Sequence, residues 1–130
     1  MIMISKGYAL DDAAIATMFE DRKRLFIDLL GWDVPVTDDR YEIDQFDGDH
    51  ATYLIACHSD GGHNASLRLL PTNGPHILGD LFGELCDHGI PRGPKIAEIT
   101  RLCLPTRLGA ACRLAVRNRL ISAMVDHALA

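Results

Sequence analysis

With 130 residues, of which 48% are apolar and 24% charged, the chain has the composition of one globular domain with a buried core. A net charge of −5 and the absence of a Lys/Arg block argue against a nucleic-acid surface, which needs a concentrated positive stripe. No apolar stretch is long enough to cross a membrane and the first residues lack a signal-peptide pattern, so we expect a cytoplasmic protein.

The cysteines and histidines predict neither disulfides nor a metal site. The four cysteines form no C-x-x-C pair, and the six histidines form no i, i+4 pair and no H-E-x-x-H motif. We therefore expect free thiols and no bound metal.

The first predicted element is a helix that begins near Asp11 or Asp12 and ends at Gly31. Helical spacing gives it a buried stripe, within which Arg22 falls. A charge among apolar residues needs a carboxylate partner, which makes Arg22 either a structural ion pair or part of a site. The stripe consists of Ile15, Met18, Phe19, Phe26, Leu29 and Leu30.

An acidic segment follows, with Glu42, Asp44 and Asp47 inside six positions and apolar residues between them. Three carboxylates at this spacing either belong to a solvated loop, the commoner outcome, or meet the isolated arginines of the chain. The segment is the first candidate for a site.

A β-hairpin is predicted next, with a strand over residues 51–57, a turn over 58–62 and a returning strand over 65–70. Alternation places Arg68 with Ser66 and Leu70, opposite Leu67 and Leu69. Arg68 is therefore an isolated cation on one sheet face, either exposed or recruited by the carboxylates.

A short helix over residues 77–85, a strand over 95–104 and a last helix complete the chain. Glu98 and Arg101 face opposite sides of a regular strand, so they share a site only if a β-bulge re-aims one of them. A buried glutamate is a candidate general base, and a salt-bridged sheet residue is the alternative. For the last helix we expect a buried side made of Leu114, Leu120, Ile121, Met124, Val125 and Ala128.

Taken in order, these segments resemble the acyl-homoserine-lactone synthases, the enzymes that make the autoinducers of bacterial quorum sensing. No single segment is specific, but the ordered series covers most of the chain. It comprises Met18-Phe19-Glu20-Asp21-Arg22, Phe26, Leu30-Gly31-Trp32-Asp33-Val34-Pro35, Glu42-Ile43-Asp44-Gln45-Phe46-Asp47, Tyr53-Leu54-Ile55-Ala56, Arg68-Leu69-Leu70-Pro71-Thr72, Gly74-Pro75-His76, Leu81-Phe82, Ile90-Pro91-Arg92-Gly93-Pro94 and Glu98-Ile99-Thr100-Arg101.

The resemblance implies an α/β (α+β) fold of the GNAT acyltransferase type, a mixed twisted sheet flanked by helices. Residues 1–130 would form a single domain, truncated after the helix that follows the fourth strand. The implied reaction transfers an acyl group from acyl carrier protein, or from coenzyme A, to the amine of S-adenosylmethionine. Lactonisation then releases methylthioadenosine, so S-adenosylmethionine is a substrate and no cofactor is implied.

The resemblance also assigns residues to the site. Glu98 and Arg101 are implied as catalytic, with Glu98 as the base. The implied substrate-binding residues are Arg22, Phe26, Trp32, Asp44, Asp47, Arg68 and Phe82.

Two departures from the family pattern leave alternatives open. Ala97 stands where many members have a tryptophan, and members of the family continue beyond the position of Ala130. One alternative is a non-catalytic remnant that keeps only the S-adenosylmethionine side of the site. Another is a GNAT-type transferase that uses acyl-coenzyme A and a different amine.

Overall fold

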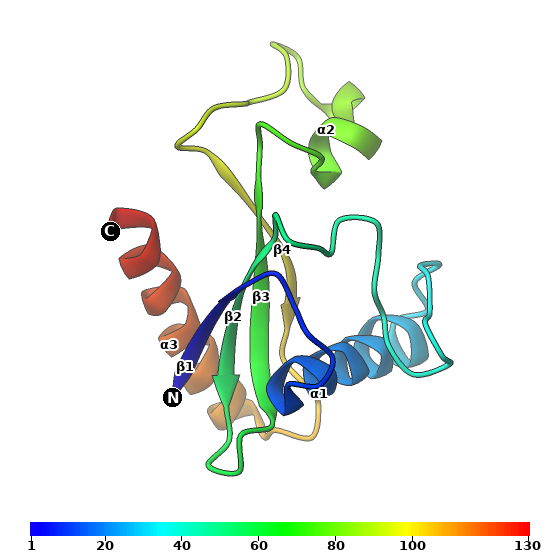
Figure 1. Ribbon diagram of the computed structural model, residues 1–130, viewed down its shortest axis with the longest axis vertical. Coiled ribbons are helices and arrows are strands. Elements are labelled where there is room, and N and C mark those ends of the chain that lie inside the picture. The colour runs from blue at the N-terminus through cyan, green and yellow to red at the C-terminus, as the bar shows by residue number, and fades with distance from the viewer.

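The computed structural model describes all residues from 1 to 130 and places one sheet between helices on its two faces (Figure 1). The strands are β1 (Ile2–Lys6), β2 (Thr52–Cys57), β3 (His63–Pro71) and β4 (Ala97–Cys103). The helices are α1 (Ala13–Arg22), α2 (Ile77–Leu81) and α3 (Ala110–Leu129), with a π-helical segment at Lys23–Leu29 and a 3-10 turn at Gly83–Leu85. No helix is long and apolar enough to span a membrane.

The sheet has the order β1-β2-β3-β4, and every neighbouring pair is antiparallel. The expected α+β architecture is confirmed, but a mixed sheet is wrong for these four strands. Parallel neighbours need a crossover that returns the chain to the same end of the sheet, and no connection between these strands makes one. β1 was not predicted from the sequence, because the first residues were tested only for a signal-peptide pattern.

The two faces of the sheet carry separate cores, which follow from strand alternation. Tyr53 and Ile55 face α1, whereas Leu54 and Ala56 face α3. In Figure 1, α1 lies on one side of the strands and α3 on the other. The α1 face is the one that carries the charged residues described below.

The first helix begins at Asp12, whose carboxylate accepts hydrogen bonds from the amides of Ala14 and Ile15, and ends before Gly31 at φ +70°. Both ends agree with the prediction. The expected burial of Leu29 and Leu30 is wrong, because these side chains are 60% and 54% exposed. From Lys23 onward the turns are π-helical, which rotates later residues away from the α-helical stripe.

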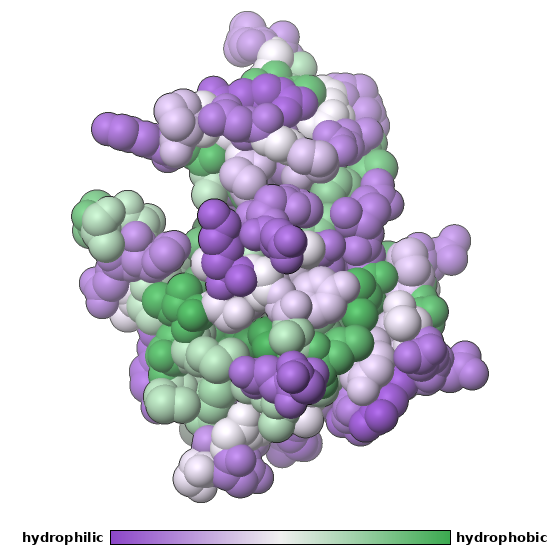
Figure 2. Space-filling model, in the orientation of Figure 1, coloured by the Kyte–Doolittle hydropathy of each residue, from purple (hydrophilic) through white to green (hydrophobic).

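Helix α3 buries a narrower stripe than expected, with only Val116 and Leu120 fully covered. Met124 packs partly against the α3-side core. Among the other expected positions, Leu114, Ile121, Val125 and Ala128 are exposed, since no further element of the described chain covers that side of the helix. On the face drawn in Figure 2, apolar surface likewise gathers in the lower half of the molecule.

Candidate active site

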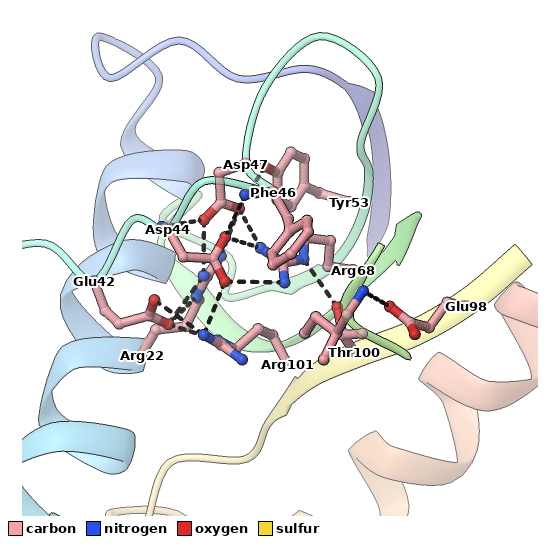
Figure 3. Close-up of polar contacts among 11 residues, drawn as sticks. Arg22, Glu42, Asp44, Phe46, Asp47, Tyr53, Arg68, Glu98, Thr100 and Arg101 are labelled. Carbon is pink, nitrogen blue, oxygen red and sulfur yellow. Dashed lines mark hydrogen bonds and ion pairs between the residues drawn. The ribbon is translucent and has the colours of Figure 1, made fainter. Parts of the chain in front are cut away.

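Three carboxylates and three arginines alternate in one network on the α1 face of the sheet (Figure 3). Glu42, Asp44 and Asp47 come from the loop before β2, the acidic segment that was the first candidate for a site in the sequence. The arginines come from three different elements: Arg22 ends α1, Arg68 lies in β3 and Arg101 lies in β4. Their formal charges cancel.

Arg22 lies at the bottom of the network and is 1% exposed. Its Nε donates to Glu42 at 2.9 Å, and its two terminal nitrogens donate to the two oxygens of Asp47 at 3.0 Å each. Burial opposes the charge on Arg22, but Asp47 and Glu42 outweigh this effect and raise its pKa. The inward position that helical spacing gave to Arg22 is therefore confirmed, together with the carboxylate partner that it required.

Arg68 is fully buried, so an exposed position on the strand is wrong for this residue. Its terminal nitrogens donate to the two oxygens of Asp44 at 2.6 and 3.2 Å, and its Nε donates to Thr100 at 2.9 Å. A paired guanidinium and carboxylate fix each other's orientation as well as their charge.

A β-bulge brings Arg101 into the network. Arg68 pairs with Thr100 and Ser66 with Cys103, so one residue of β3 faces two residues of β4 at this point. Arg101 has φ +51°, a left-handed conformation that is uncommon outside glycine. Its side chain consequently reaches the same face as Thr100, with its Nε 2.8 Å from Glu42 and a terminal nitrogen 2.9 Å from Asp44.

Asp47 ties the network to the core of the domain. Its carboxylate also accepts the Tyr53 hydroxyl proton at 2.6 Å and the Asp44 amide at 2.9 Å. Burial works against ionisation of Asp47, but Arg22, and then Arg68 and Tyr53, lower its pKa below the ordinary value. Burial, together with the Asp47 carboxylate, raises the pKa of Tyr53.

The site residues that the family resemblance implied did not include Glu42, Tyr53 or Thr100. Glu42 bridges Arg22 and Arg101 and stood inside the acidic segment, which was a usable signal. Tyr53 and Thr100 are ordinary strand residues by pattern, and only their contacts show their place in the network.

A cavity of about 560 Å³ opens above the network. Asp44 and Arg101 lie at the boundary between the cavity and the charged network. The more deeply buried Arg22, Asp47 and Arg68 support them from the side away from the cavity. The lining residues are Trp32, Asp33, Val34, Pro35, Asp44, Gln45, Phe46, Ile77, Leu81, Phe82, Thr100 and Arg101.

Aromatic side chains form part of the cavity wall. Trp32 stacks on Phe26 with ring centroids 4.4 Å apart, and the guanidinium carbon of Arg101 lies 5.2 Å from the Trp32 ring. Phe26 is buried behind Trp32, whereas Trp32 and Phe82 are 41% and 45% exposed. A cation held over such faces gains from the ring quadrupole.

Glu98 lies apart from the network, beyond Thr100 in Figure 3. It does not line the cavity, and its two carboxylate oxygens accept hydrogen bonds from the backbone amides of Ile77 and Leu78, both at 2.8 Å. The bulge therefore places Arg101 and Thr100 at the cavity while Glu98 meets α2. The role of Glu98 as a base stays a prediction.

Carboxylate oxygens of Glu42, Asp44 and Asp47 lie within 4.8 Å of one another, a spacing that could also hold a cation. Here each carboxylate is paired with at least one arginine, so guanidinium groups already supply the positive charge. A larger groove, of about 720 Å³, lies beside the end of α3 and has no carboxylate in its lining. The charged network belongs to the smaller cavity.

A family model described as autoinducer synthase matches residues 7–129, almost the whole chain. The chain belongs to the autoinducer synthase family. The resemblance found in the sequence is thus confirmed, and the curated relatives of this family member are acyl-homoserine-lactone synthases. One, from Ralstonia nicotianae, is 36% identical over 110 residues, which cover 83% of this chain and 53% of the relative. Another, from Rhizobium etli, is 37% identical over 122 residues, covering 92% and 57%.

This autoinducer synthase family member spans about half the length of those curated relatives. Among solved structures it is similar to TofI in complex with an inhibitor and MTA, with a TM-score of 0.78, 27% identity and coverage of 98% of this chain and 65% of TofI. LasI gives a TM-score of 0.77 at 25% identity, covering 99% and 66%. The chain therefore has the fold of the family from β1 to α3.

Proposed function

We propose that this chain binds S-adenosylmethionine and acts in the synthesis of acyl-homoserine lactones. The observation that carries the proposal is the cavity of about 560 Å³, which combines aromatic walls with a boundary made of Asp44 and Arg101. Its size falls in the range of small-molecule sites, roughly 300–1,000 Å³. TofI, which this chain resembles at 27% identity, has been solved with MTA, the neutral product expected from S-adenosylmethionine.

S-adenosylmethionine has charges that match the cavity. Its sulfonium and ammonium groups are cationic and suit Asp44, Asp33 and the face of Trp32, while its carboxylate suits the guanidinium of Arg101. Because Asp44 and Arg101 are already paired, the substrate meets donors and acceptors whose orientation is fixed before it binds.

The proposed reaction has two steps. The amine of S-adenosylmethionine, after losing a proton, attacks the thioester carbonyl, and the thiol leaves with a proton. The carboxylate of the acylated product then attacks the carbon next to the sulfonium, which closes the lactone and releases methylthioadenosine. S-adenosylmethionine is consumed as a substrate, so no separate cofactor enters the proposal.

The proposed acyl donor is a thioester of acyl carrier protein, with acyl-coenzyme A as the alternative. MesI, which is 27% identical with a TM-score of 0.71, is a CoA-dependent acyl-homoserine lactone synthase. Both donors carry a phosphorylated pantetheine arm. A phosphate suits the start of α3, where Arg107 precedes the N-cap Gly109 and Arg113 lies in the first turn.

A second candidate function is a non-catalytic relative that binds S-adenosylmethionine only. The position of β4 favours it, because this strand lies at the edge of the sheet with Ile96, Ile99 and Leu102 between 40% and 54% exposed. An apolar edge strand of this kind can pair with another strand. The acyl side of the site would then depend on that additional strand.

The test incubates the purified chain with S-adenosylmethionine and either acyl carrier protein thioesters or acyl-coenzyme A, with mass spectrometry of the products. An acyl-homoserine lactone supports the first function, and the donor that yields it identifies the donor class. Calorimetric binding of S-adenosylmethionine without any product supports the second. Absence of binding to the folded chain refutes both, and an acylated product formed from another amine points to a different GNAT-type transferase.

Asp44→Asn, with Asp39→Asn as its control, tests the site itself. Asp39 is exposed, lies outside the cavity and carries the same charge. We expect Asp44→Asn to weaken S-adenosylmethionine binding and Asp39→Asn to leave it unchanged. Equal affinities for the two variants would place the ligand elsewhere.

A further inference from the structure

Glu98 makes a contact that is independent of any proton transfer. Its Oε1 accepts the amide of Ile77 and its Oε2 accepts the amide of Leu78, both at 2.8 Å, although these residues lie 21 and 20 positions away along the chain. Ile77 and Leu78 are the first two residues of α2. The first amides of a helix have no partner inside the helix, and a carboxylate is their strongest acceptor.

Apart from the packing of Ile77 against the core on the α1 face, helix α2 has little else to hold it. It has five residues, none of which is buried, and the preceding His76 provides no side-chain hydrogen bond to the helix amides. The ring of His76 contacts the carbonyl of Gly74 instead. A helix this short does not form in isolation. The charged hydrogen bonds from Glu98 therefore supply the fixed connection between α2 and β4.

The position of α2 matters because this segment forms one wall of the cavity. Ile77, Leu81 and Phe82 line it together with Trp32, while Glu98 itself does not. A change in the orientation of α2 would move three apolar contacts of a bound ligand together.

We propose that Glu98 is a positioning residue: its carboxylate fixes α2 against β4 and thereby sets the place of Phe82 on the cavity wall. The ligand part of this inference rests on the proposed function, whereas the contact between Glu98 and α2 does not. Glu98→Gln separates the two roles, because glutamine keeps the length of the side chain but directs an NH₂ group at one of the two backbone amides.

The first experiment measures amide hydrogen exchange in the unliganded chain. In Glu98→Gln we expect exchange at Ile77 and Leu78 to be about 10-fold faster or more, with the amides of β2 and β3 unchanged, since a local opening leaves the rest of the fold protected. Glu84→Gln is the matched control, because Glu84 is exposed, lies in the 3-10 turn after α2 and undergoes the same loss of charge. Equal protection in wild type and Glu98→Gln overturns the inference.

The second experiment titrates methylthioadenosine and follows the fluorescence of Trp32, the single tryptophan of the chain. Methylthioadenosine lacks the methionine amine that is deprotonated and acylated in the proposed reaction, so a role in proton transfer alone leaves its affinity unchanged. A lost hydrogen bond that positions the wall predicts a dissociation constant about 3- to 10-fold higher in Glu98→Gln. Unchanged affinity despite faster exchange refutes the role in the ligand site, and failure of wild type to bind any ligand refutes the proposed function while the exchange result stands.

Discussion

Asp47→Asn is the sharpest test of the charged network. Asp47 holds both terminal nitrogens of Arg22, contacts Arg68 at 3.1 Å and accepts the Tyr53 hydroxyl. Asparagine has nearly the same shape but carries no charge, so the substitution changes a neutral buried cluster into one with an uncompensated positive charge. The structure therefore predicts a large loss of stability from a small change in shape.

The magnitude follows from the burial of the partners, whose side chains are 0–1% exposed. Breaking a buried ion pair by removing one partner costs about 3–5 kcal/mol. For a chain of this size that loss lowers the melting temperature by roughly 10–20 °C. It is also a large part of the total stability of an ordinary domain, which is about 5–15 kcal/mol.

Urea unfolding followed by circular dichroism measures this loss, with Asp28→Asn as the matched control. Asp28 forms an ion pair of 3.0 Å with Lys23, and the two side chains are 48% and 26% exposed. An exposed pair of this kind contributes about 0–1 kcal/mol. A loss below about 1 kcal/mol for Asp47→Asn, equal to that of the control, would refute the argument that burial makes the network strong.

The same variant has a predicted pH signature. Arg22 and Arg68 lower the pKa of Asp47 in the folded chain in spite of its burial, so the unfolded chain binds a proton at this residue first as the pH falls. The stabilisation from Asp47 is fully present above about pH 4 and is lost at lower pH. The stability of Asp47→Asn should accordingly fall less steeply below pH 4 than that of wild type.

Three further predictions concern other residues. Burial lowers the pKa of His63, so the folded chain keeps this side chain neutral at pH values where the unfolded chain protonates it. The free energy of unfolding should therefore decrease as the pH falls below about 6.5. The urea midpoints of His63→Gln should change less with pH in this range than those of wild type. Asp33 lines the cavity without an ion pair, so Asp33→Asn should weaken binding of cationic S-adenosylmethionine while the affinity for neutral methylthioadenosine stays constant. Asp38→Asn is the control, because Asp38 is exposed and lies outside the cavity. Equal losses of affinity for both ligands would exclude a charge effect. Trp32→Leu should reduce affinity for both ligands, as calorimetry would detect, because it removes the aromatic face beside Arg101.

Local sequence patterns predicted those features of the fold that depend on neighbouring residues, such as the ends of the first helix. Asp12 and Gly31 bound the first helix because capping and a left-handed backbone depend on adjacent residues. The burial of Leu29 and of α3 was predicted less well, since a π-helical segment changes the periodicity and the covering layers come from distant parts of the chain.

The sequence by itself determined that one charge of the site needs a partner. Arg22 lies within an apolar stripe, where it is costly unless an opposite charge meets it, and the carboxylates at three of six positions were the candidates for that partner. Strand alternation likewise determined the face of Arg68, which the core residues on both sides confirm.

Tertiary structure alone decided which partners meet and which residue reaches the cavity. The bulge at Arg101 turns its side chain toward Glu42 and Asp44, and regular alternation would have directed it to the opposite face. Glu98 meets the amides of α2, 20 and 21 residues away, through a pairing that no local pattern encodes. Backbone conformation at a bulge and contacts between distant segments depend on how the whole sheet packs, which is why these features of the site appeared only in the folded chain.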